Sequence, residues 1–367
     1  MHGKNKKNAL ARNLLSSSIA LAAVMASTSY AEVETTNTFS GYVKMDTIFS
    51  MENDATGGLR EQALLTLNAD EAKDEEGDLY MSAFESRLNF TSKSTGTPVG
   101  DIKAVIEGDM YSGATQNIFN LRHAYFTQGN LTFGQTWSTF MDLGALAETA
   151  DFGGPAARIF TRQAQIRYTV KMGDNKLDLA LEKPKNSVDP TLPDLVANYT
   201  AKTGFGHVSA GLLAQSINED DGTNDDSAMA IAARVSGRVN LGSDNLKFSV
   251  ISGQGLGGYM NFGDTPAYDF STGKIELSDQ TGFKLAYQHV FSSTVRSTLR
   301  YAQTTNEIDG VDLGDFSSIH ANVIYNPYKP LSYGAEYIAA TKAKTTGNGL
   351  TEDRELSRVH LFAKFAF

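Results

Sequence analysis

Basic side chains recur in segments where apolar residues occupy every second position, and they fall on the positions between. A guanidinium group stays charged at any physiological pH, and its paired N–H donors match a carboxylate. Basic groups that share one enclosed surface therefore attract small anions. Fourteen basic residues share this parity: Lys44, Arg87, Lys103, Arg122, Arg167, Lys202, Arg234, Arg238, Lys247, Lys284, Arg296, Arg300, Arg358 and Lys364. Seven acidic residues share it: Asp46, Glu85, Glu107, Asp109, Asp178, Glu182 and Glu336.

A second interpretation of these charges stays open for any single residue. Each basic group could pair with an acid on a neighbouring strand and only hydrate a polar wall. The twofold excess of basic positions argues against this for the whole set, because the chain itself carries a net charge of −10. The acidic chain also lacks the basic surface that contacts phosphates, so we expect no nucleic-acid partner.

Hydrolytic chemistry has little support in the sequence. There is no cysteine and no Gly-x-Ser-x-Gly motif. His320 and His360 share the parity of the basic residues but fall on segments that are not neighbours, whereas His123 and His289 fall on the apolar parity. We therefore expect no catalytic residues, no cofactor, no metal site and no enzyme.

Alternation with period two identifies the elements that carry these residues. At the C-terminus Val359, Leu361, Ala363, Phe365 and Phe367 are apolar, and the alternate positions hold Arg358, His360, Phe362, Lys364 and Ala366. Such alternation places the two sets on opposite faces of a strand. Sixteen segments show it: 38–50, 79–91, 100–111, 119–127, 131–138, 158–170, 176–183, 194–202, 206–218, 227–240, 246–258, 279–291, 295–304, 314–326, 331–342 and 355–367.

Connections between these segments alternate between tight Gly, Asn, Asp and Pro turns and long stretches such as 51–78, 139–157 and 259–278. An even number of strands with short turns at one end and long loops at the other is typical of an outer-membrane barrel. The sequence thus predicts an all-β, 16-stranded antiparallel transmembrane barrel with both termini at the periplasmic end. A secreted β-sandwich or propeller is the alternative, and the lack of a second apolar face argues against it.

The N-terminal residues 1–31 have the pattern of an export signal. Four basic residues precede an apolar stretch at 14–25, and Ser29 and Ala31 suit cleavage after Ala31. Removal of these residues changes the net charge from −10 to −14, because they include four basic and no acidic residues. We expect residues 32–367 to form the barrel in the bacterial outer membrane.

The run from Asn130 to Asp142, Asn-Leu-Thr-Phe-Gly-Gln-Thr-Trp-Ser-Thr-Phe-Met-Asp, together with Leu121-Arg122-His123-Ala124-Tyr125, resembles the DcaP-like trimeric outer-membrane porins. The resemblance also covers Ser40–Asp46, Glu85–Phe90, Ile106–Met110 and Arg158–Tyr168, and it is strongest over residues 38–170. It implies a homotrimer that passes small anions, such as dicarboxylates or aromatic acids, by passive diffusion. Some members of the family carry an N-terminal coiled coil, which we do not expect here, because the first strand begins soon after Ala31.

The resemblance further implies that residues 139–157 fold into the barrel as a constriction loop, with Asp142, Glu148 and Asp151 facing the basic wall. We expect Arg87, Arg122, Arg167, Arg296 and Arg300 to line the pore and contact solute, with Lys44 and Lys103 second in rank. The acidic runs at 70–78 and 219–226 are either solvated loops or sites where divalent cations bridge to lipopolysaccharide. We therefore expect outer-membrane lipid and lipopolysaccharide as partners. A general non-selective porin and a structural or adhesive barrel remain alternatives, and conductance steps in a planar bilayer separate a channel from the latter.

Overall fold

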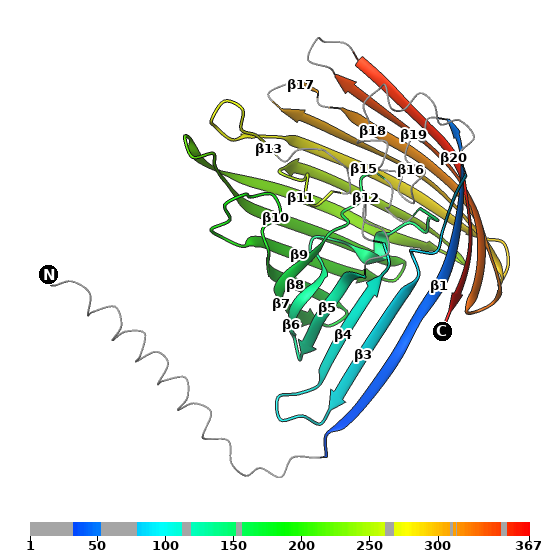
Figure 1. Ribbon diagram of the computed structural model, residues 1–367. Coiled ribbons are helices and arrows are strands. Elements are labelled where there is room, and N and C mark those ends of the chain that lie inside the picture. Colours follow the sequence, from blue (N-terminus) through cyan, green and yellow to red (C-terminus); the bar gives the residue numbers. More distant parts are fainter. Residues whose placement is uncertain are drawn as a thin grey trace.

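A single antiparallel sheet curves round and closes on itself in the computed structural model (Figure 1). The structure describes residues 32–52, 79–111, 119–151, 156–260, 268–308, 311–312, 314–345 and 351–367. Closure occurs where the first strand pairs with the last, for example Val43 with Phe365. A closed sheet leaves no strand edge without hydrogen-bond partners, which is what a bilayer requires.

Sixteen strands, which we call staves, form the wall of the barrel, as the alternation predicts. They are β1 (Glu34–Glu52), β3 (Arg87–Thr95), β4 (Ile102–Asp109), β5 (Asn120–Gln128), β6 (Leu131–Trp137), β7 (Arg162–Met172), β8 (Asn175–Glu182), β9 (Asp194–Thr203), β10 (Gly206–Asp220), β11 (Asp225–Leu241), β12 (Asp244–Gln254), β15 (Asp279–Val290), β16 (Val295–Ile308), β18 (Asp315–Tyr328), β19 (Leu331–Thr345) and β20 (Thr351–Ala366). Two short strands, β2 (Leu79–Ser82) and β17 (Val311–Asp312), extend the staves of β3 and β18 by pairing with β1 and β16. A separate hairpin joins β13 (Tyr268–Asp269) and β14 (Glu276–Leu277).

Most short connections lie at one end of the barrel, and the long ones lie at the other together with the four-residue β10–β11 turn. Seven connections of two to six residues join β3 to β4, β5 to β6, β7 to β8, β9 to β10, β11 to β12, β15 to β16 and β18 to β19. β1 begins and β20 ends at that same end (Figure 1). We call it the turn end and the opposite one the loop end. In outer-membrane barrels short turns face the periplasm, so the loop end faces the cell exterior.

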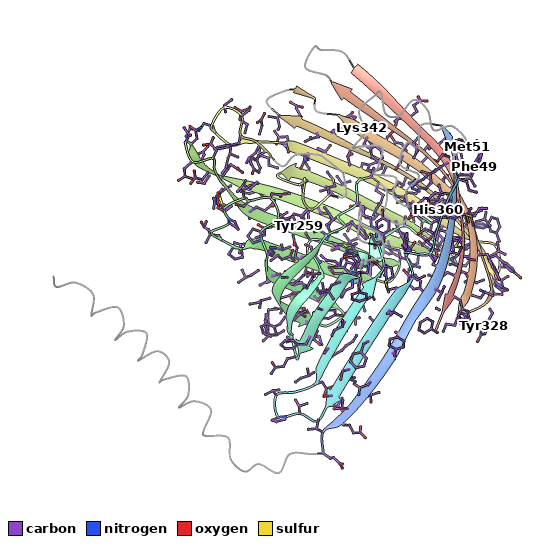
Figure 2. The ribbon with its side chains drawn as sticks, viewed as in Figure 1. Phe49, Met51, Tyr259, Tyr328, Lys342 and His360 are labelled. Carbon is purple, nitrogen blue, oxygen red and sulfur yellow. The ribbon has the colours of Figure 1, made fainter. Side chains whose placement is uncertain are left out.

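The wall is apolar outside and polar inside, which is the reverse of a water-soluble protein. Leu212 and Ile231 on the outer face are 59% and 61% exposed, whereas the charged Asp109 and Arg300 on the inner face are 0% and 1% exposed. Figure 2 shows the same contrast between Phe49 on the outer surface of β1 and His360 inside. Among the described residues no helix is long and apolar enough to cross a membrane.

Candidate functional site: the barrel lumen

The chain between β6 and β7 runs through the interior of the barrel. We call its described part, residues 138–151, the inner segment, and residues 156–161 the return limb. A one-turn 3₁₀-helix, η2 (Leu143–Ala145), lies in the inner segment and is capped by the Asp142 carboxylate, which accepts from Gly144 N at 2.9 Å. A Cβ at Gly144 would lie 2.5 Å from His207 Cε1, so a larger residue here would have to displace the His207 ring from its position beside Asp142.

Three acidic residues of the inner segment contact basic side chains on widely separated staves. Asp142 lies 3.0 Å from His207 Nε2 on β10 and accepts a hydrogen bond from Ser236 on β11. Glu148 accepts both Nε and Nη2 of Arg296 on β16, at 2.7 and 2.6 Å. Asp151 lies 2.5 Å from Arg358 Nη2 on β20.

These three contacts stretch the inner segment across the lumen from β10 to β20. For Asp142, burial alone would raise the pKa of the carboxyl. The hydrogen bonds from Ser236 and His207 outweigh burial and hold that pKa below its usual range.

Backbone groups of the inner segment are also held by the wall. Glu336 on β19 accepts the backbone N–H groups of Ala150 and Asp151 at 2.9 and 3.3 Å. Two lysines donate to carbonyl oxygens, Lys247 to Leu146 at 2.6 Å and Lys284 to Ala145 at 2.9 Å. Charge-assisted bonds of this kind are about twice as strong as neutral ones, so the segment is fixed at both its side chains and its backbone.

An apolar cluster packs the inner segment against one side of the wall. Phe140 and Tyr259 are its largest members and meet edge to face, with ring centroids 6.2 Å apart. Small and branched residues of β8 to β12 line the wall beneath them: Ala180, Val196, Leu213, Ala232 and Ile251. Figure 2 shows Tyr259 inside the barrel, where its hydroxyl donates to Asp194 at 2.8 Å.

The sequence-based boundaries are wrong where this cluster forms. Residues 158–161 and 255–258 were expected to belong to wall strands, but β7 begins at Arg162 and β12 ends at Gln254. The two limbs pair with each other instead, through the Ile159–Met260 bridge and the hydrogen bond from Phe160 N to Tyr259 O. Alternation detects an extended segment but not the segment with which it pairs. It could therefore not show that residues 158–161 and 255–258 leave the wall where β7 begins and β12 ends.

Several of the basic residues predicted to line the pore are ion-paired. Arg122 bonds Asp109 at 2.7 Å and lies 3.4 Å from Glu107, and Arg87 lies 3.2 Å from that same Glu107. Lys44 contacts Glu85 and also Asp46, the latter at 2.9 Å. Arg300, 1% exposed, donates to the carbonyl oxygen of Ala156 in the return limb.

The remaining predicted residues, Arg167 and Lys103, line an open cavity. Its volume is about 900 Å³, and it lies between the inner segment and the turn end. Arg167 donates to Gln165 Oε1 and to Trp137 O at 2.7 Å and has no carboxylate partner among the described residues. Lys103, Lys202 and Arg238 also line the cavity, and none of them is ion-paired with any part of the chain that the structure describes.

The carboxylates of this cavity are already engaged. Glu107 lies with Arg87 and Arg122, and Asp142 with His207 and Ser236. Asp178 accepts from Thr169 and from Lys176, at 2.6 and 2.7 Å. The cavity therefore has positive charges that no described carboxylate neutralises.

Arg158 and Arg162 are lumen residues that the alternation did not single out. Arg158 stacks on Phe160 with its guanidinium carbon 3.7 Å from the ring centroid, and Arg162 lies 4.8 Å above the Trp137 ring. Burial, followed by the charge of Arg300, lowers the pKa of Arg158 to about 9, so it stays charged at neutral pH. Arg158, Phe160 and Arg162 occupy every second position, and this spacing predicts a wall strand over 158–170 and gives no sign that residues 158–161 lie in the lumen.

His123 was expected on the outer face, and this is wrong. The β4–β5 register shifts between Glu107 and Gly108, which pair with His123 and Leu121 and leave Arg122 as an extra residue. Such a bulge turns neighbouring side chains to the same face. His123 therefore lines the cavity, where it is 7% exposed and its Nδ1 lies 3.1 Å from Thr136 Oγ1.

The acidic runs expected in outer loops divide into two cases. Residues 70–78 lie outside the described residues, as does the expected signal segment 1–31. At the β10–β11 turn, Asp221 accepts the backbone N–H groups of Thr223 and Asn224, both at 2.7 Å, so its carboxylate closes a tight turn. No group of three or more His, Cys, Asp and Glu side chains in the described part of the chain is arranged to hold a metal ion.

The family model for the DcaP outer membrane protein matches residues 3–367, nearly the whole chain. The chain belongs to this family. No curated protein matches its sequence. The outer membrane channel DcaP of Acinetobacter baumannii has a similar structure, with a TM-score of 0.78 at 24% identity over 91% of this chain and 97% of that one. Together with the closed barrel, family membership identifies an outer-membrane channel of the porin type.

Two other solved porins resemble this DcaP-family barrel in fold. OmpT of Vibrio cholerae, in its trimer form, gives a TM-score of 0.62 at 14% identity over 91% of this chain and 99% of that one. An anion-selective porin from Comamonas acidovorans gives 0.60 at 14% identity over 91% and 100% of the two chains. Identities this low establish the shared architecture and no more.

Proposed function

We propose that this channel passes small anionic solutes by passive diffusion, and that the inner segment is the constriction that they must pass. The observation that carries the proposal is the cavity of about 900 Å³, where Lys103, Arg167, Lys202 and Arg238 face the lumen without a carboxylate partner among the described residues. In a pore with low-dielectric walls such an excess is poorly screened and concentrates anions.

The pairing pattern reassigns the predicted arginines. Arg87 and Arg122 contact Glu107 and the buried Asp109, and Arg296 contacts Glu148 of the inner segment, so their charges are largely neutralised locally. We assign solute contact to Arg167 and Lys103, and their position on the wall of the open cavity supports this assignment. Dicarboxylates and aromatic acids, the solutes that the family resemblance implies, carry the charge that this wall attracts.

A reversal-potential measurement under a salt gradient tests the proposal. A unit charge about 8 Å from the permeating ion changes its energy by about 0.5 kcal/mol in water. The energy of an anion and that of a cation change in opposite directions, so each neutralised residue changes the anion-to-cation permeability ratio about fivefold. We expect wild type to prefer anions, and Arg167→Gln and Arg238→Gln each to reduce that preference.

Lys274→Gln is the matched control, because Lys274 is 72% exposed in the β13–β14 hairpin, away from the cavity, and should leave the ratio unchanged. A wild-type channel that prefers cations would refute the proposal. No preference would support the alternative of a general, non-selective porin.

We also infer a homotrimer, supported by the dimensions of one side of the barrel. β4 and β6 have only 8 and 7 residues, and β5 between them has 9, whereas a tilted strand needs about 9 to 11 to span the bilayer core. Another protein surface covers such a short wall better than lipid does. Native mass spectrometry should find three chains in each particle, and a monomer in mild detergent would contradict the inference.

A further inference from the structure

A small pocket lies where the inner segment, the return limb and the wall meet, and we call it the junction pocket. Its volume is about 10 Å³, which is room for one water molecule or one monatomic ion and too little for a carboxylate or a phosphate. All three parts of the chain contribute polar residues to its lining: Asp142, Arg158, Arg234, Ser236, Ser249 and Lys284.

Two wall residues bring hydrogen-bond donors to this pocket. Ser249 on β12 and Lys284 on β15 face each other in the sheet, and each is 4% exposed. The Ser249 hydroxyl has no hydrogen-bond partner in the part of the chain that the structure describes. Lys284 uses one of its three N–H groups on Ala145 O, at 2.9 Å. One O–H and two N–H groups are therefore left for the pocket.

Arg158 brings a further cation from the return limb. Its Nε is buried without a hydrogen-bond partner, and its guanidinium forms no ion pair with a described residue. The acid that acts on it most strongly is Asp151, which is bonded to Arg358 at 2.5 Å. Because Arg158 stays charged at neutral pH, its position calls for a counter-ion.

The charges around the junction pocket do not cancel. Lys284 lies in the fields of Arg300 and Arg158, and both act on it more strongly than Asp142 does. Asp142 is the one acid among the described lining residues, and its carboxylate is engaged by Ser236 at 2.6 Å and by His207 at 3.0 Å. Buried cations without a partner are costly, and a bound anion removes that cost.

We propose that the junction pocket binds one chloride ion, which accepts hydrogen bonds from Lys284, Ser249 and Arg158 and so joins the inner segment and the return limb to the wall. A monatomic anion accepts N–H and O–H donors from any direction, and such charge-assisted bonds are strong. A water molecule has the right size but leaves the positive charge in place. The ion is a resident part of the fold and differs from a permeating solute, so the proposal goes beyond anion diffusion and does not depend on it.

Crystallography of the full-length protein with bromide in place of chloride tests the proposal, because bromide gives an anomalous signal at its absorption edge and water gives none. We expect one peak in each chain, in contact with Lys284 Nζ and Ser249 Oγ. A series of soaks gives the bromide concentration that half fills the site. A hydrogen bond to an ion is worth about tenfold to a hundredfold in affinity, so Ser249→Ala should raise this concentration about tenfold and Lys284→Gln about a hundredfold.

Lys247→Gln is the matched control. Lys247 also donates to a carbonyl oxygen of the inner segment, Leu146 O at 2.6 Å, but it does not line the junction pocket. This variant should bind bromide like wild type. Ser249→Ala keeps every charge, so it tests the pocket even if Lys284→Gln fails to fold.

Density without an anomalous signal in wild type would identify water and overturn the proposal. Unchanged bromide binding in Ser249→Ala would also overturn it, as would a loss in Lys247→Gln as large as that in Lys284→Gln. Ser249 does not line the large cavity of about 900 Å³, so Ser249→Ala should keep wild-type ion selectivity. This test therefore fails or succeeds separately from the proposed function.

Discussion

Replacing Glu336 by glutamine should loosen the inner segment while the barrel remains closed. Each oxygen of this carboxylate accepts one backbone N–H, from Ala150 at 2.9 Å and from Asp151 at 3.3 Å. Asn322 donates at 2.8 Å and His320 lies at 3.0 Å. A glutamine has one acceptor oxygen, so one backbone N–H would face an amide donor instead.

The magnitude follows from these contacts. Hydrogen bonds to a charged group contribute about 1.5 to 3 kcal/mol each, and Glu336 is 1% exposed, so solvent does not replace them. Losing one bond and the charge assistance of another weakens the attachment by about 3 kcal/mol. The fraction of time for which this part of the segment is detached should then rise about a hundredfold.

Single-channel recording in a planar bilayer is the assay. We expect Glu336→Gln to produce open-channel noise and a larger mean conductance than wild type. Asp178→Asn is the control for channel noise, because Asp178 is also a buried inward carboxylate but, among the described residues, bonds only Thr169 and Lys176 of the wall. A quiet Glu336→Gln channel with wild-type conductance, in a barrel that still shows heat-modifiable migration, would refute the reasoning.

Three further predictions concern the segment and assembly. Reversing the charge of one partner of the Arg296–Glu148 pair, as in Glu148→Arg, should raise channel noise. Adding Arg296→Glu restores opposite charges and should restore a quiet channel. A double variant no quieter than the single one would contradict this. Phe367→Asp should sharply lower the amount of heat-modifiable barrel in the membrane fraction, because a carboxylate would replace the ring beside Phe39, 6.1 Å away. The Asp142 pKa lies below its usual range in the folded state, so its attachment is present at neutral pH and is lost only as pH falls through that lowered pKa. Channel noise can be recorded as the pH is lowered. Noise that begins while the pH is still within the ordinary range of aspartate pKa values, in wild type but not in Asp142→Asn, would show that the Asp142 pKa is not lowered.

The strands could be predicted because the bilayer imposes one simple pattern on them. A stave needs apolar side chains toward lipid and polar ones toward the lumen, so pairs such as Leu299 and Arg300 reveal their faces by parity alone. All sixteen staves and both kinds of connection follow from this pattern. Parity fails where its assumption fails, as at the β5 bulge that turns His123 inward beside Arg122.

The lumen contacts could not be predicted, because they depend on chain that does not belong to the wall. Alternation placed Arg296 and Arg358 on the inner face but could not show that Glu148 and Asp151 would bond to them. The cluster of Phe140 and Tyr259 also interrupts the polar lining of β8 to β12, where the parity rule expects only an inner polar face. Non-local packing of this kind has no period in the sequence.

The excess of basic over acidic positions in the sequence was counted over the whole wall, but the structure concentrates its unpaired part near one end. Carboxylates of the inner segment and of β4 engage other inward arginines, as Glu148 does Arg296 and Asp109 does Arg122. Arg167 and Arg238 are left facing the cavity on the turn side of the inner segment. If the proposed function holds, an anion that enters from the loop end would meet these charges only after it has passed the inner segment, so neutralising Arg167 or Arg238 should reduce anion preference for entry from either side.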